Sequence, residues 1–114
     1  MSNINSFNEV TDEDFKSKVL NNPLPVIVVF ERSCWGAAHI MKPILKNILS
    51  DYPGKIEIYR YNMDKNFSVS RFYRVQDELA ILVFNKSTVV NKTGVISSTE
   101  LRKIIEPLIE ITQV

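Results

Sequence analysis

The segment Phe30–Pro43, FERSCWGAAHIMKP, contains the single cysteine of this chain of 114 residues. Cys34 follows an apolar run typical of a buried strand and precedes residues with helical spacing. A helix N-terminus stabilises a thiolate, which is the nucleophilic form of cysteine. Cys34 is therefore a candidate nucleophile, and His39 is a candidate base for it. A histidine in the first turns of a helix is more often solvated, and no third group that would orient its ring is evident.

Composition excludes several other classes of site. One cysteine and one histidine are too few ligands for a structural zinc, so we expect no metal and no cofactor. The net charge of +1 offers no basic surface for nucleic acid. The longest apolar run, LPVIVVF, is too short to cross a bilayer. The N-terminal MSNINSFNEV lacks the features of a signal peptide, which predicts a cytoplasmic location.

The elements that position Cys34 follow from local patterns. PVIVVF, residues 25–30, is continuous and β-branched, as in a strand covered on both faces. The spacing of apolar residues predicts a helix over residues 36–49 with Pro43 inside it. Further strands are expected at residues 6–10, 56–62, 80–84 and 89–94, and further helices at 11–20, 65–75 and from 97 onward. The order β-α-β-α-β-α-β-β-α predicts one α/β domain, residues 1–114, with a mixed sheet and helices on both faces.

This order, with VIVVFERSCWGAAHIMKPIL, KIEIYRYNMDKN, YRV and AILVFNKSTVV, resembles the thioredoxin family over nearly the whole chain. The resemblance implies a thioredoxin-like fold and a W-C-G-P-C-K motif after the buried strand. It also implies a buried aspartate beside that strand's last phenylalanine, and a cis-proline facing the two cysteines. Counting forward from Phe30 and backward from Pro43 gives one register, in which Trp35 replaces the nucleophilic cysteine and Ala38 the resolving cysteine.

The other family positions also depart from the pattern, Gly36 excepted. The replacements are Cys34 for tryptophan, Ala37 for proline, His39 for lysine, Val29 for the buried aspartate and Leu79 for the cis-proline. We expect a trans bond before Leu79. Dithiol exchange needs a thiolate, a second thiol and a proton acceptor. Trp35, Ala38 and Val29 supply none of these, which predicts a redox-inactive domain.

Several residues around this loop have two interpretations. Cys34 is either a lone nucleophile, which a register slipped by one residue would place in a C-x-x-x site near the helix start, or a half-buried inert thiol at the strand end. Trp35 is either exposed as an interaction hot spot or folded back over the small residues behind it. The pairs Glu31–Arg32 and Asp77–Glu78 border the site as solvated charges, unless Arg32 and Glu78 bind a charged peptide or each other. Of Phe67 and Phe72, one is expected in the core and the other exposed.

Two functions of different class remain open. The first is a protein or peptide interaction module, in which Trp35 and the loop at Glu78 and Leu79 recognise an extended peptide by strand addition. The second is a thiol enzyme that exchanges disulfides, for example with glutathione, through Cys34 alone. A structural role in a larger assembly or a homodimer is a third possibility. The sequence indicates neither the partner nor the oligomeric state.

Overall fold

The computed structural model describes residues 7–32 and 34–110, and its elements follow the predicted order. The strands are β1 (Asn8–Val10), β2 (Val26–Glu31), β3 (Glu57–Asn62), β4 (Ala80–Asn85) and β5 (Thr88–Thr93). The helices are η1 (Lys16–Leu20), α1 (Gly36–Asp51), α2 (Ser68–Phe72) and α3 (Ser98–Glu110). Within the described residues, no helix is long and apolar enough to span a membrane.

The five strands form one mixed sheet in the order β1-β3-β2-β4-β5. β3 runs parallel to both β1 and β2, whereas β4 is antiparallel to β2 and to β5. β2 lies in the centre, and residues Val26–Phe30 are all buried. A central strand is covered on both faces, which explains why this run is continuously apolar.

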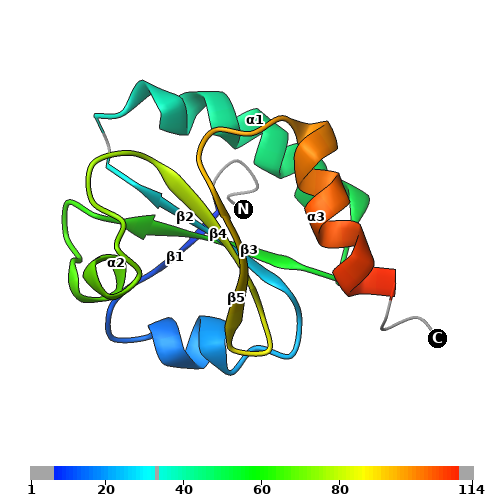
Figure 1. The fold of residues 1–114 in the computed structure, drawn as a ribbon, viewed down its shortest axis with the longest axis horizontal. Helices are drawn as coiled ribbons and strands as arrows, with labels where there is room; N and C mark the ends of the chain where they lie inside the picture. The colour runs from blue at the N-terminus through cyan, green and yellow to red at the C-terminus, as the bar shows by residue number, and fades with distance from the viewer. Residues whose placement is uncertain (1–6, 33, 111–114) are drawn as a thin grey trace.

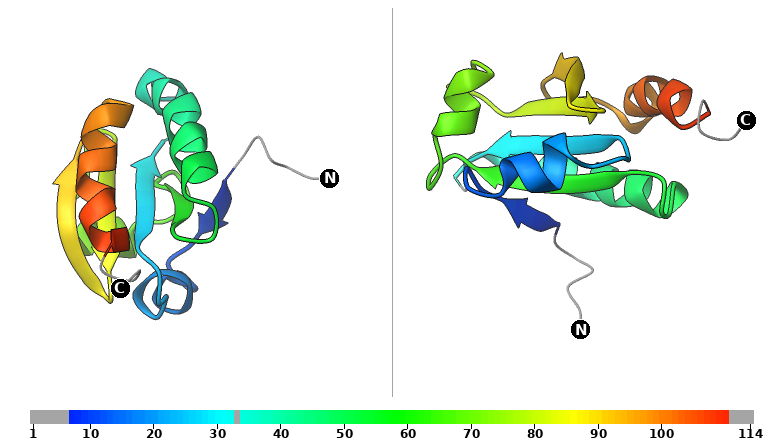
Figure 2. Two further views of the ribbon diagram at one scale, coloured as in Figure 1. Left: turned by 90° about the vertical axis from the view of Figure 1, so that its right-hand side faces the viewer. Right: turned by 90° about the horizontal axis from the view of Figure 1, so that it is seen from below.

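Two core clusters form on opposite faces of the sheet because successive strand side chains alternate in direction. Val29 and Ile81 belong to the cluster under α1 and α3, which we call the α1–α3 cluster. Phe30 and Leu82 belong to the cluster under η1 and α2, the η1–α2 cluster. Figure 1 shows α1 and α3 together beside the sheet, and Figure 2 gives two further views of these layers. The predicted mixed sheet with helices on both faces is confirmed.

The first helix is shorter than predicted. Thr11 and Asp14 form the expected reciprocal cap, with the Thr11 N–H 2.6 Å from Asp14 Oδ1 and the Asp14 N–H 3.4 Å from Thr11 Oγ1. Residues 12–14, inside this cap, form a turn, and regular structure follows at η1, a π-helix. The Asn21 N–H donates to the Lys16 carbonyl, five residues earlier, at 2.9 Å.

The third helix is also shorter than the predicted residues 65–75, and the prediction for its aromatic residues was wrong. Phe67 and Phe72 are both exposed, at 61% and 75% of their surface. Val69 and Tyr73, four residues apart, pack against the η1–α2 cluster instead. Since residues four apart share one helix face, the two phenylalanines fall outside the face that meets the core.

The turn between β4 and β5 consists of Lys86 and Ser87, because Asn85 pairs with Thr88. Both turn residues have positive φ, 53° and 73°. A two-residue turn of this kind matches the twist of the strands, although Asn-Gly is the sequence that favours it most. The predicted hairpin therefore forms without a glycine.

Candidate functional site

A tight turn leads into α1 and carries the two positions that the resemblance assigns to cysteines. Trp35 is the residue before the helix, with φ −83° and ψ 124°. Its N–H donates to the Arg32 carbonyl at 3.1 Å, and its own carbonyl accepts the Ala38 N–H at 3.2 Å. Trp35 and Ala38 thus stand at the two ends of one hydrogen-bonded turn. Gly36 is exposed, and a Cβ added to it would meet no atom within 4 Å.

Cys34 is exposed, so the expectation of a half-buried thiol at the strand end was wrong. β2 ends at Glu31, and Cys34 lies in the connection to α1 rather than in the strand. The sheet therefore does not cover the sulfur. His39, in the first turns of α1, is exposed as expected.

Trp35 is half-buried and packs against both core clusters. The Arg32 guanidinium lies 5.8 Å from the centre of its ring, at a distance that allows a cation–π interaction. Ala37 and Ala38 pack beside it against the α1–α3 cluster. Of the two interpretations of Trp35, these contacts favour the folded-back indole, with part of its surface left accessible.

Val29 and Leu79 are buried in that same cluster, with 2% and 5% of their surfaces exposed. The peptide bond between Glu78 and Leu79 is trans, as predicted. The fold therefore brings Val29, Leu79 and the start of α1 against one cluster. Glu78 is exposed beside them in the chain.

Glu78 and Leu79 line an open groove next to the edge strand β5. Its walls are residues 74–80 on one side and residues 92–94 on the other. Lys92 Nζ donates to the carbonyls of Tyr73 and Arg74, at 3.0 and 3.3 Å, and so ties β5 to the segment before β4. Residues 76–78 are all exposed. The groove therefore lies between an accessible loop and the end of the edge strand β5.

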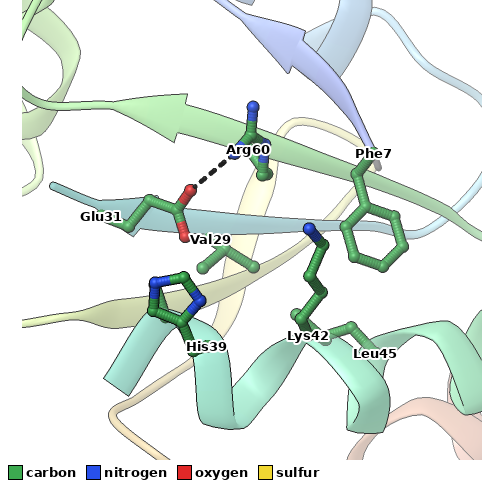
Figure 3. Close-up of a pocket in the computed structure, with 8 residues that line it drawn as sticks. Phe7, Val29, Glu31, His39, Lys42, Leu45 and Arg60 are labelled. Carbon is green, nitrogen blue, oxygen red and sulfur yellow. Dashed lines mark hydrogen bonds and ion pairs between the residues drawn. The ribbon is translucent and has the colours of Figure 1, made fainter. Parts of the chain in front are cut away.

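A second hollow, of about 200 Å³, lies between α1 and the β2–β3 face (Figure 3). The Glu31 side chain at its rim is mostly shielded from solvent, contrary to the expectation of a solvated residue. Its side chain is only 13% exposed and accepts a hydrogen bond from Arg60 at 3.1 Å. Burial raises the pKa of Glu31 above its ordinary value, although Arg60 and Lys42 oppose this effect.

Sequence reasoning did not include Arg60 in the site, and the only sequence signal for this part of it was the spacing of Glu31 from Val29. Glu31 is two residues after Val29, so both side chains lie on the same side of β2. Arg60 is the register partner of Val29 in β3. A second carboxylate, that of Glu9 in β1, also pairs with Arg60 at 3.1 Å.

Arg32 pairs with a different residue from the one considered. Its guanidinium donates to the Met63 carbonyl at 3.1 Å and lies 3.4 Å from Asp64 Oδ1. It is thereby held against the loop after β3, and this contact does not involve Glu78. Across residues 7–32 and 34–110, no group of three or more His, Cys, Asp or Glu side chains could hold a metal ion.

Comparison with known proteins agrees with this geometry. The family model described as Thioredoxin matches residues 6–107. Thioredoxin from Buchnera aphidicola subsp. Acyrthosiphon pisum is 29% identical over 104 residues, which are 90% of this chain and 96% of that protein. Thioredoxin 1 from Nostoc sp. is 29% identical over 99 residues, which are 86% of this chain and 92% of that protein. Thioredoxin from Rickettsia felis is 32% identical over 77 residues, which are 68% of this chain and 73% of that protein. The chain belongs to the thioredoxin family.

Proposed function

We propose that this domain binds peptides and does not carry out dithiol exchange. The observation that carries the proposal is the tight turn at the start of α1, which has Trp35 and Ala38 at its two ends. The relatives are named thioredoxins. Exchange of the thioredoxin kind needs a second thiol to resolve the mixed disulfide. This chain has one cysteine in all.

The groove at Glu78 and Leu79 is the proposed binding surface. An extended peptide gains affinity by pairing its backbone with exposed backbone groups, and this mode of binding requires no thiol. Residues 76–78 are exposed, whereas Leu79 is anchored in the α1–α3 cluster. This combination supports a rigid recognition loop. The accessible part of Trp35 would supply an aromatic contact at the other loop.

A selection from a library of extended peptides tests the binding proposal. The best peptide is then titrated against wild type, Glu78→Arg and a control, Glu13→Arg, which reverses an exposed charge outside the groove. We expect Glu78→Arg to change affinity about tenfold or more and the control to match wild type. Equal affinity of all three proteins, or a failure to select any peptide, would remove the support for this groove.

Reduction of insulin by dithiothreitol tests the loss of dithiol exchange. The wild-type chain should add nothing to the rate of dithiothreitol alone, because no intramolecular thiol can release a bound insulin chain. A rate that rises in proportion to wild-type protein and is lost in Cys34→Ser would contradict the proposal, because it would show that this chain exchanges disulfides.

The exposure of Cys34 favours a second candidate, exchange through a single thiol. In that reaction the Cys34 thiolate would attack glutathione disulfide, forming one S–S bond to a glutathione sulfur while the other glutathione leaves as a thiolate. A reactive thiol of this kind is alkylated faster than free cysteine at neutral pH. Iodoacetamide kinetics, with Cys34→Ser as the blank, therefore separate the two candidates. An alkylation rate no higher than that of free cysteine would eliminate the single-thiol enzyme.

A further inference from the structure

The hollow between α1 and the β2–β3 face has an apolar floor and a polar rim. Ala38, Lys42 and Leu45 recur at positions i, i+4 and i+7, so they form one stripe of α1 over the sheet. The side chain at Ala38 is only a methyl group, so it leaves a space between α1 and Val29. Phe7 closes one side of it, as Figure 3 shows.

The rim carries two basic side chains, Arg60 and Lys42, and among the described residues only Arg60 is ion-paired. Arg60 and Lys42 face the hollow with Glu31 as the single carboxylate in its lining, and Glu9, outside the lining, also pairs with Arg60. Within residues 7–32 and 34–110, Lys42 forms no ion pair. Lys42 acts on Glu31 through space, but its ammonium group has no direct carboxylate contact there and could make one with a ligand.

Arg60 has one hydrogen-bond donor left over. Its two terminal nitrogens are engaged by Glu31 and Glu9, each at 3.1 Å. Its Nε atom is buried and has no hydrogen-bond partner among the described residues. A buried N–H without an acceptor is unfavourable, so an additional oxygen at this point would stabilise the structure.

We propose that this hollow is a binding site for a small carboxylate with an apolar body. The apolar body would lie against Phe7, Val29 and Leu45, and the carboxylate would accept a hydrogen bond from Lys42 Nζ. Arg60 Nε is closed to solvent in this structure, so it would donate a second hydrogen bond only after the Arg60 side chain turns toward the hollow. A space of about 200 Å³ is the volume of roughly seven water molecules, which suits a single ring or a short chain. The hollow shares no lining residue with the groove at Glu78, so this proposal does not depend on peptide binding.

Benzoate is the probe, and benzamide is its neutral counterpart of nearly the same shape. Both are titrated into the ¹⁵N-labelled chain while amide signals and the Arg60 Nε–H signal are followed by NMR. We expect benzoate to shift the Arg60 Nε–H and the amides of residues 38–45 with one saturation curve. Benzamide should bind about 10- to 100-fold more weakly, the value of one or two charge-assisted hydrogen bonds.

Lys42→Met tests the charge while keeping most of the side-chain length, and Lys103→Met makes the same change at an exposed position of α3. Lys42→Met should weaken benzoate binding about tenfold or more, and Lys103→Met should leave it unchanged. Thermal unfolding checks that both variants fold. The site is refuted if benzoate shifts no signal around the hollow, if benzamide binds equally well, or if the two variants bind alike. Shifts spread over many surface lysines without saturation would refute it as well.

Discussion

The carboxylate of Asp12 fixes the position of α2. It accepts a hydrogen bond from the Tyr61 hydroxyl at 2.6 Å. It also accepts three backbone N–H bonds at the start of the helix, from Phe67 at 3.1 Å and from Ser68 and Val69 at 3.0 Å. A helix of five residues is not stable by itself, so its position depends on this anchor. Because α2 leads directly into the groove segment, the anchor also supports the proposed peptide site.

Asp12→Ala should lower the free energy of unfolding by about 2–4 kcal/mol at neutral pH. Loss of a helix cap accounts for about 0.5–2 kcal/mol of this. The rest comes from Tyr61, whose buried hydroxyl loses a charged acceptor, at a cost of about 1.5–3 kcal/mol. Asp12→Asn keeps one acceptor oxygen without the charge, so its free energy of unfolding should lie between those of Asp12→Ala and wild type.

The effect should depend on pH with a definite sign. Burial alone would raise the pKa of Asp12, but the Tyr61 hydroxyl and the three backbone N–H groups together lower it below its ordinary value of 3.8. A group whose pKa is lower in the folded state contributes stability above its unfolded pKa, and this contribution disappears as the pH falls through the folded pKa. The difference between wild type and Asp12→Ala should therefore be constant near neutral pH and should shrink below about pH 3.8.

Urea unfolding followed by circular dichroism at several pH values measures this difference. Glu13→Ala is the matched control, because it removes the neighbouring carboxylate, which is exposed. It should change stability by less than about 0.5 kcal/mol. A loss in Asp12→Ala no larger than that of the control, or a loss that is the same in acid as at neutral pH, would refute the role assigned to this carboxylate.

Four other changes have definite expected outcomes. Trp35→Ala should lower the free energy of unfolding, measured in urea, by about 2 kcal/mol. This is below the ~3–5 kcal/mol of a fully buried tryptophan because the indole is only half-buried. An unchanged free energy of unfolding would contradict the packing of Trp35 on both clusters. Trp35→Cys with Ala38→Cys should form a disulfide on mild oxidation, measured by thiol titration, because the turn between them holds the Cα atoms within about 7 Å. Lys86→Asn should raise stability by about 0.5–1 kcal/mol, since asparagine tolerates the φ of 53° better than lysine. Burial raises the pKa of Glu31 above its ordinary value of 4.5, so the folded state holds this proton more tightly than the unfolded chain. The free energy of unfolding of wild type should therefore fall as the pH rises from 4.5 through the folded pKa, and Glu31→Gln should remove this pH dependence.

Local sequence patterns were sufficient for the elements whose neighbours lie close in the chain. The apolar face of α3 is an example: Leu101, Ile105 and Ile109 are buried at helical spacing. The predicted cap before it is present in part, because the Glu100 N–H donates to Ser97 Oγ at 3.2 Å. The continuous run in β2 was likewise enough to place that strand at the centre of the sheet.

Local patterns failed where a distant residue decides the structure. The start of α2 is set by Asp12, more than fifty positions earlier, and no local feature of residues 65–75 contains that information. The packing of Trp35 is similar. Its place in the register followed from counting between Phe30 and Pro43, but its burial depends on both core clusters and on Arg32.

The carboxylate of Glu31 indicates that cysteines placed at positions 35 and 38 would not by themselves support rapid disulfide exchange. It lies on the same side of β2 as Val29 but about 6.6 Å further along the strand, at 3.3 Å per residue. It is also bound to Arg60 at 3.1 Å, which leaves it poorly placed to take a proton from residue 38. A disulfide between positions 35 and 38 depends only on the turn, whereas turnover also needs a proton acceptor at the second thiol. Disulfide formation without rapid insulin reduction is therefore the outcome that this arrangement of charges requires.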